Sequence, residues 1–177
     1  GDALGVPYEF HGPAAIPPLD QIEMAPPAGF RRAHGSVPPG AWSDDGAQAL
    51  ALLASLLECG RLDVDDFGRR LVAWYERGYM AVDNRVFDVG IQTSQAITAL
   101  QRGVPASQAG PAGERNNGNG SLMRALPLAL WHQGSDAEMV ADAHAQSAVT
   151  HGHPRSQVCC ALYCLWTRRS LAGAADP

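Results

Sequence analysis

A hydroxyl and two carboxylates stand side by side at Ser43-Asp44-Asp45, directly before a long apolar segment. Adjacent aspartates repel each other, and either a cation or the positive end of a helix can compensate their charge. The three side chains could supply one side of the oxygen shell of Mg²⁺. They also suit an ordinary helix start, with Ser43 as the N-cap and both aspartates in the first turn. Taken alone, the triplet leaves both interpretations open.

Two further acidic residues could take part in proton transfer. Glu9 closes the run from Gly1 to Tyr8, and its place after a proline and an aromatic residue could tune its pKa. A solvated glutamate is the simpler interpretation. Asp88 follows Phe87 where a helix is expected to begin, so it could instead be a first-turn acid that favours the helix dipole.

A glycine-rich loop and a histidine pair could bind a ligand. The loop is Asn116-Asn117-Gly118-Asn119-Gly120-Ser121, followed by Leu122, Met123 and Arg124. Its backbone N–H groups, ahead of a helix, would suit a phosphate or diphosphate, although a flexible turn with a serine cap is the alternative. His151 and His153 could ligate a metal or hydrogen-bond a sugar, or could simply lead into a helix at Pro154.

The elements that must position these groups are predicted to be helices. Apolar residues recur at helical spacing, with caps and glycine stops, in six segments: Asp44 to Glu58, Asp63 to Gly78, Phe87 to Gln101, Ser121 to Trp131, Ser135 to about Val149, and Pro154 through Leu165. Pro127 should kink its helix or delay its start. Residues 11–42 are rich in proline and glycine, which predicts a long functional loop or lid. Because no segment alternates like a strand, we expect an all-α fold, an orthogonal multi-helix bundle.

Composition narrows the classes of function. A chain of 177 residues fits a single domain, 1–177, with a real core. The net charge of −5, with arginine as the one basic residue type, argues against a nucleic-acid partner. No apolar run reaches the length of a membrane span, and no signal peptide is visible. The four cysteines lack the spacing of a zinc site and suggest free, buried thiols. We therefore predict a cytoplasmic protein with no membrane partner.

Taken together and in this order, the motifs resemble the ADP-ribosylglycohydrolase family, which includes ADP-ribosylarginine hydrolases and the enzyme that reactivates dinitrogenase reductase. The matching runs are G-D-A-L-G with Glu9, S-D-D at 43–45, F-D-V-G at 87–90, G-N-G-S-L-M-R at 118–124 and T-H-G-H-P at 150–154. The resemblance extends from Gly1 to about Arg168. It implies an all-α, orthogonally packed fold whose central cleft holds two Mg²⁺ (sometimes Mn²⁺) ions.

The resemblance also implies metal-binding and catalytic roles. Ser43, Asp44 and Asp45 match the metal ligands of the family. Glu9 matches an acidic residue that is catalytic in some members, and Asp88 matches an acidic residue near the metals. We therefore expect Glu9, Asp45 and Asp88 to be the catalytic residues.

The remaining implied roles concern the substrate. The family cleaves the bond between the anomeric carbon of ADP-ribose and a modified side chain, so the expected partner is ADP-ribosylated protein and the product is ADP-ribose. Arginine is the expected modified residue. The residues expected to bind the diphosphate and ribose are Gly118, Asn119, Gly120, Ser121, Met123 and His151.

Three departures from the family pattern limit these expectations. Ser43 replaces the usual threonine but keeps the hydroxyl, and Ile91 replaces a usual asparagine near the cleft. The second metal motif of the family, Asp-x-Asp-Thr or Ser near the C-terminus, is absent from the end of this sequence. We therefore expect an incomplete copy of the domain that lacks the C-terminal metal-binding segment. A catalytically impaired relative that binds ADP-ribose is the alternative function.

Overall fold

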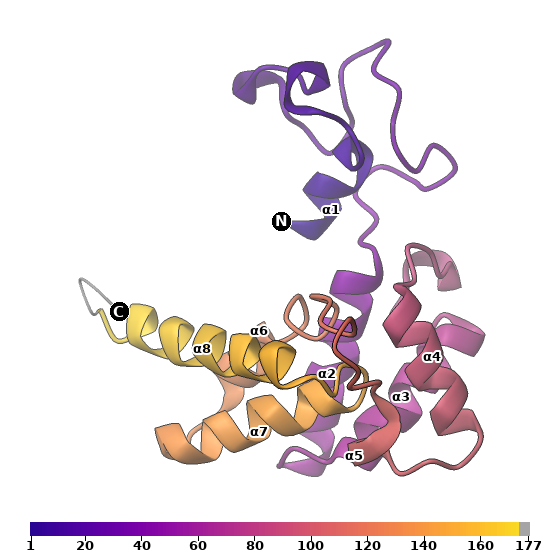
Figure 1. Cartoon of the computed structure of the whole chain (residues 1–177). Helices are drawn as coiled ribbons and strands as arrows, with labels where there is room; N and C mark the ends of the chain where they lie inside the picture. The colour runs from indigo at the N-terminus through magenta and orange to yellow at the C-terminus, as the bar shows by residue number, and fades with distance from the viewer. Residues whose placement is uncertain (174–177) are drawn as a thin grey trace.

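The computed structural model describes residues 1–173, and all regular structure in that range is helical (Figure 1). The α-helices are α1 (Asp2–Gly5), α2 (Asp44–Cys59), α3 (Val64–Arg77), α4 (Ile91–Gln101), α5 (Ala106–Ala109), α6 (Leu126–Trp131), α7 (Asp136–Ala148) and α8 (Pro154–Leu171). The predicted all-α class is confirmed. Residues 174–177, the last of the expected 1–177 domain, lie outside the described residues.

Side-chain caps and glycines set the helix ends that the sequence predicts well. The Ser43 hydroxyl accepts the N–H of Asp45 at the start of α2. Ser135 and Glu138 form a capping box at the start of α7, each side chain accepting the other's backbone N–H. Gly60 ends α2 in the left-handed conformation, with φ of 64°. The predicted bounds of α2, α3 and α7 are therefore confirmed to within about a residue.

One predicted helix start is wrong, and a second is delayed. α4 begins at Ile91 rather than at Phe87, because Asp88 takes a left-handed φ of 56° that an α-helix cannot contain. α6 also begins late, after turns at residues 121–124. Pro127 lies in its first turn, where the missing N–H removes no hydrogen bond. The delayed start is one of the two outcomes expected from Pro127.

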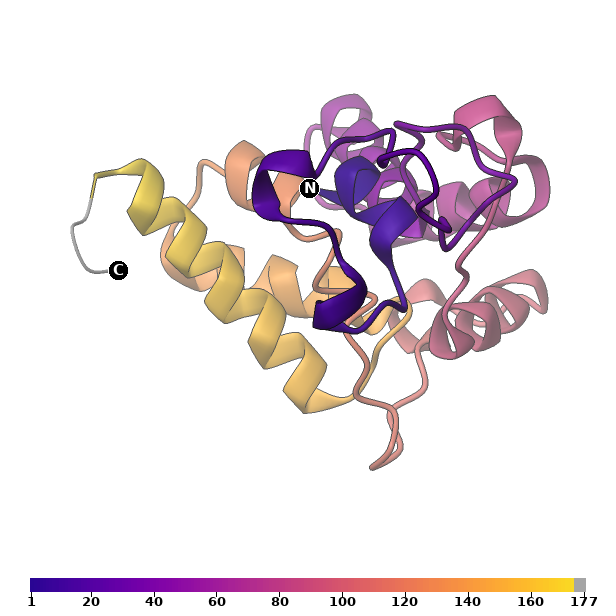
Figure 2. The same cartoon turned by 90° about the horizontal axis from the view of Figure 1, so that it is seen from above.

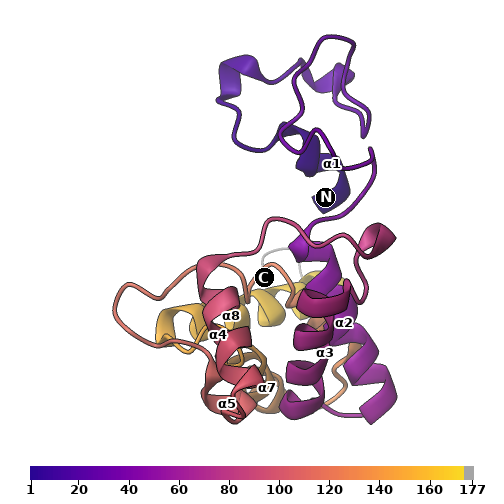
Figure 3. The same ribbon diagram turned by 90° about the vertical axis from the view of Figure 1, so that its right-hand side faces the viewer.

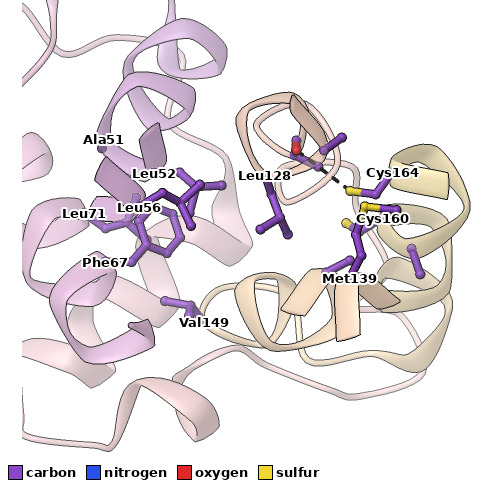
Figure 4. Packing of buried hydrophobic residues seen from close by; sticks show 14 of the residues in the cluster. Ala51, Leu52, Leu56, Phe67, Leu71, Leu128, Met139, Val149, Cys160 and Cys164 are labelled. Carbon is purple, nitrogen blue, oxygen red and sulfur yellow. Dashed lines mark hydrogen bonds between the residues drawn. The ribbon is translucent and has the colours of Figure 1, made fainter. Parts of the chain in front are cut away.

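The helices of the body pack in two pairs joined by a short helix. α7 lies along α8, α2 lies along α3, and α6 contacts both α2 and α8 (Figures 1 and 2). The main core lies between these pairs (Figure 4) and includes Leu52, Leu56, Phe67, Leu71, Leu128, Met139, Val149, Cys160 and Cys164. All four cysteines are free thiols, but the prediction that they are buried holds only for Cys160 and Cys164, since Cys59 is half-buried and Cys159 is exposed.

Residues 1–42 form a segment of turns above the helical body (Figures 1 and 3). Its 3-10 turns are Val6–Tyr8, Pro13–Ala15 and Leu19–Gln21. The Tyr8 hydroxyl donates to the carbonyl of Glu23 at 2.8 Å and accepts the N–H of Glu23 at 3.0 Å, which closes the first loop. The indole N–H of Trp42 donates to the Met80 carbonyl at 2.8 Å, anchoring the end of the segment on the body. None of the helices within residues 1–173 has the length and apolar character to cross a membrane.

Candidate functional site

Nine of the eleven predicted site residues line one cleft of about 440 Å³. The cleft lies where the start of α2 meets the loops before α4, before α6 and after α7. The nine are Glu9, Asp44, Asp45, Asp88, Gly118, Asn119, Gly120, Met123 and His151. The other two, Ser43 and Ser121, lie behind its wall. Two larger hollows, of about 570 and 470 Å³, lie elsewhere on the molecule and contain none of the predicted site residues.

The floor of the cleft is acidic. Burial first, and then the charges of Asp45, Asp88 and Asp2, raise the pKa of Asp44 to about 8. Burial is also the first cause of the raised pKa of Asp45, about 6, followed by repulsion from other carboxylates of the site. Among residues 1–173, no salt bridge reaches Asp44, Asp45 or Asp88. A cation or protons must therefore neutralise this cluster.

Ser43 caps α2 and is held by a residue that the sequence did not single out. The Asp2 carboxylate accepts the Ser43 hydroxyl at 2.9 Å and the backbone N–H groups of Ser43 and Gly46 at 3.0 and 2.8 Å. Asp2 thus joins α1 to the positive end of α2. The cap interpretation of the triplet is correct for Ser43, while Asp44 and Asp45 still face the cleft. The two interpretations are compatible.

Asp88 reaches the cleft because the backbone reverses at this residue. Its neighbours Phe87 and Val89 are partly buried, Phe87 against His34 and Val89 against the small cluster around Trp74. The left-handed φ of Asp88 lets both apolar neighbours pack inward while the carboxylate lines the cleft. Asp88 is therefore a loop residue and not the first-turn acid of a helix that the sequence pattern allowed.

Glu9 is held by a histidine that sequence analysis missed. The His34 Nε2 lies 2.7 Å from the Glu9 Oε2. The His34 ring packs against Phe87 and Phe10, at centroid distances of 5.0 and 5.7 Å. Ligand atoms of Glu9, His34 and Asp88 all lie within 4.8 Å of one another. Glu9 thus has a fixed place beside Asp88. His34 lies in the proline- and glycine-rich segment without any motif, so no sequence signal could have found it.

The glycine loop, residues 118–120, packs closely against the side chains of Gln92 and His151. The Gly118 N–H donates to the Gln92 Oε1 at 2.8 Å, and a Cβ at Gly118 would lie 2.7 Å from that oxygen. A Cβ at Gly120 would lie 2.8 Å from the His151 Cε1. A side chain at Gly118 or Gly120 would therefore displace the side chain of Gln92 or His151. The hydroxyl of Ser121 is buried at 2.8 Å from that of Ser147, so it supports the loop from behind.

Two polar side chains of this wall are available to a ligand. His151 is 3% exposed, and burial first, with the charge of Arg124 second, lowers its pKa to about 4. Its imidazole is therefore neutral at pH 7, with Nδ1 2.8 Å from the Thr150 hydroxyl. The Nε2 edge lies on the side of the glycine loop. Gln92 also lines the cleft, and its buried Nε2 has no hydrogen-bond partner within the described residues. A ligand oxygen would satisfy that donor.

Comparisons with known proteins agree with the geometry. The family model described as ADP-ribosylglycohydrolase matches residues 1–177, so the chain belongs to the ADP-ribosylglycohydrolase family. It is 34% identical over 161 residues to ADP-ribosylarginine hydrolase Tri1 of Serratia proteamaculans, covering 90% of this chain and 41% of that protein. It is 32% identical over 165 residues to ADP-ribosyl-[dinitrogen reductase] glycohydrolase of Rhodospirillum rubrum, covering 90% of this chain and 50% of that protein.

A solved structure shares the fold. It is described as an ADP-ribosylglycohydrolase-related protein complex, and it superimposes with a TM-score of 0.74 at 31% identity. The match covers 98% of this chain and 53% of that chain. The chain therefore spans about half the length of the relatives that it matches. The predicted fold and family are confirmed, while the individual site residues stay predictions that the cleft brings together.

Proposed function

We propose that this chain acts in the metal-dependent removal of ADP-ribose from ADP-ribosylated protein, with arginine as the modified side chain. Hydrolysis would occur at the anomeric carbon of the ribose. The observation that carries the proposal is the cluster of buried Asp44, half-buried Asp45 and exposed Asp88, which form no salt bridge within residues 1–173 and share one cleft with the glycine loop. Relatives named as hydrolases of ADP-ribosylarginine and of ADP-ribosyl-dinitrogen reductase support it. A cytoplasmic location stays a prediction.

The donor set of the cleft fits Mg²⁺ or Mn²⁺. Asp44 and Asp45 offer carboxylate oxygens, which hard divalent cations prefer, and the raised pKa values of both carboxyls support the proposal of a cation beside them. Ser43 would add a third ligand, because its hydroxyl donates its hydrogen to Asp2 and keeps an oxygen lone pair for a cation. When bound, the cation would polarise ribose hydroxyls and activate a water.

The acidic residues would then divide the chemistry. Glu9 would transfer a proton, because His34 holds one of its oxygens at 2.7 Å and leaves the other for the substrate. Asp45 and Asp88 would place anionic oxygens beside the anomeric carbon, where they stabilise an oxocarbenium-like transition state. These are the three residues expected to be catalytic.

The opposite wall would bind the diphosphate and ribose. Gly118, Asn119 and Gly120 present backbone near the start of α6, with His151 and Gln92 as neutral polar neighbours. A diphosphate would be repelled by the carboxylates across the cleft unless a cation lies between them. Ligand binding should therefore depend on the metal.

Alanine at Gly120 should block this wall. The added Cβ would lie 2.8 Å from the Cε1 and 3.2 Å from the Nε2 of His151, so the imidazole must shift. We expect the affinity for ADP-ribose to fall about tenfold or more in titration calorimetry, since one misplaced polar contact is worth roughly 1–3 kcal/mol. Gly12→Ala is the matched control, because nothing lies within 4 Å of a Cβ at Gly12. Equal affinities for the two variants would contradict the ligand-binding role of the loop.

Release of ADP-ribose tests the proposed activity directly. The full chain should liberate ADP-ribose from an ADP-ribosyl-arginine protein with Mg²⁺ or Mn²⁺ present, and EDTA should abolish the release. Release that persists in EDTA would refute the role of the metal. Chromatography of the free ADP-ribose provides the measurement, and addition of Mg²⁺ after EDTA should restore it.

A further inference from the structure

A guanidinium group without a carboxylate partner lies beneath the cleft. Arg124 follows the glycine loop and is fully buried, and it forms no salt bridge within residues 1–173. Its Nη1 donates to the Gln48 Oε1 at 2.9 Å. Its Nε and Nη2 donate to the side-chain and backbone oxygens of Gln146 at 3.1 and 2.8 Å. The ring of Phe67 lies 4.9 Å from the guanidinium carbon. Burying a charge with neutral partners alone costs free energy.

Arg124 fixes the orientation of the side-chain amides of Gln48 and Gln146. Because a guanidinium can only donate, each glutamine must turn its oxygen toward Arg124 and its NH₂ group away. The Gln48 Nε2 then faces the Asp44 Oδ2, at 3.5 Å, one helical turn back on α2. The Gln146 Nε2 donates to the carbonyl of Ser121 at 3.2 Å. One buried cation therefore aims a donor at the acidic floor and another at the glycine loop.

We propose that Arg124 is a positioning residue that fixes the positions of Asp44 and the glycine loop relative to each other across the cleft. The inference rests on the proposed function, since it concerns the same cleft. Through Gln48, Arg124 holds the inner oxygen of Asp44 and leaves the outer oxygen for a cation. Through Gln146, it fixes the backbone from which the loop presents its N–H groups. Its charge also attracts that of Asp44 through the buried amide.

Substitutions at Gln48 and Gln146 separate the effect of Arg124 on Asp44 from its effect on the glycine loop. Both are fully buried and accept from Arg124, but they serve different sides of the cleft. Gln48→Met should lower the affinity for Mg²⁺ about tenfold, because Asp44 loses a donor to its charged group, and should leave ADP-ribose binding at saturating Mg²⁺ within about twofold. Gln146→Met should lower the affinity for ADP-ribose about tenfold and leave the affinity for Mg²⁺ within about twofold. Arg124→Lys should weaken both, because one ammonium cannot bond three oxygens held in this fork.

Calorimetry on the full chain, stripped with EDTA and titrated with MgCl₂ or ADP-ribose, provides the affinities, and thermal unfolding of each variant provides the control. The expected result is that Gln48→Met weakens mainly Mg²⁺ binding and Gln146→Met weakens mainly ADP-ribose binding. Lowered melting temperatures with unchanged affinities in all three variants would overturn the proposal, since Arg124 would then serve the core alone.

A measurement without ligand separates this proposal from the proposed function. If the unsubstituted chain binds neither Mg²⁺ nor ADP-ribose, the proposed function fails, but the contact can still be examined in urea unfolding. Asp44→Asn combined with Gln48→Met should shift the midpoint non-additively, whereas Asp44→Asn combined with Gln146→Met should be close to additive. Additive shifts in both cycles would overturn the positioning role.

Discussion

Replacing Asp44 with asparagine should make the metal-free protein more stable at neutral pH and should also abolish its binding of Mg²⁺. The pKa of Asp44 rises from 3.8 to about 8 in the folded protein, mainly because the carboxyl is buried. The folded state therefore binds more protons than the unfolded chain between these values, so stability falls as the pH rises through this window. Each pKa unit corresponds to about 1.4 kcal/mol, so the loss by pH 7 is on the order of a few kcal/mol. Asparagine is neutral over this whole pH range, so the Asp44→Asn variant does not lose this stability.

The measurement is urea unfolding in EDTA at several pH values, with and without Mg²⁺. The unsubstituted chain should lose stability from about pH 4 to pH 8 and recover it when Mg²⁺ is added, while Asp44→Asn should show a flatter profile and no response to Mg²⁺. Asp20→Asn is the control, since Asp20 is an exposed aspartate in the turn Leu19–Gln21. A pH profile identical in all three proteins would show that Asp44 is not the group that a cation must neutralise.

Glu9→Gln should remove turnover and spare binding. A positioned proton-transfer group is worth about 10²- to 10⁴-fold in rate. Glutamine keeps the shape of the side chain and can still contact His34, so we expect affinities for Mg²⁺ and ADP-ribose to stay within about twofold to threefold. The measurement is the initial rate of ADP-ribose release, set beside calorimetry for both ligands. An equal loss of rate and affinity would make Glu9 a binding residue instead.

Glu23→Gln is a matched control for this substitution. Glu23 belongs to the same N-terminal segment, but its hydrogen bonds to the Tyr8 hydroxyl use the backbone. The Glu23→Gln variant should therefore release ADP-ribose at the same rate as the unsubstituted chain. His34→Phe, which keeps an aromatic ring against Phe87 but removes the nitrogen beside Glu9, should lower the rate less than Glu9→Gln does.

Local signals were enough to predict the helices whose ends have a cap or a stop. α2 and α7 begin at serine caps, and Gly60 ends α2 in the conformation that glycine favours. The same reasoning failed at residues 87–90. Phe87 and Val89 are apolar and continue the sequence pattern of α4, but they pack inward from a loop on either side of a left-handed Asp88. A single residue with positive φ leaves almost no trace in an amphipathic pattern.

Most of the site could be predicted because its motifs are contiguous in sequence. The resemblance assigned Asp44 and Asp45 to the metal, and both line the cleft. The supporting residues could not be found this way, because each acts through a contact between distant parts of the chain. Asp2 reaches Ser43, and His34 reaches Glu9, through the folding of a segment that has no periodic pattern. Hydrogen bonds between side chains depend on tertiary packing, which a short motif does not encode.

The separation of the N-terminal segment from the helical body has a consequence for how the protein should lose activity. Residues 1–42 contribute Val6, Tyr8, Val37 and Ala41 to the buried apolar side chains, and none of these belongs to the main core cluster. Local opening of the segment therefore costs less free energy than global unfolding. Glu9 would leave the cleft in such an opening, while Asp44 and Asp45 would stay on α2. On heating, release of ADP-ribose should stop before the fold is lost, and amide exchange should be fastest in the segment that carries Glu9.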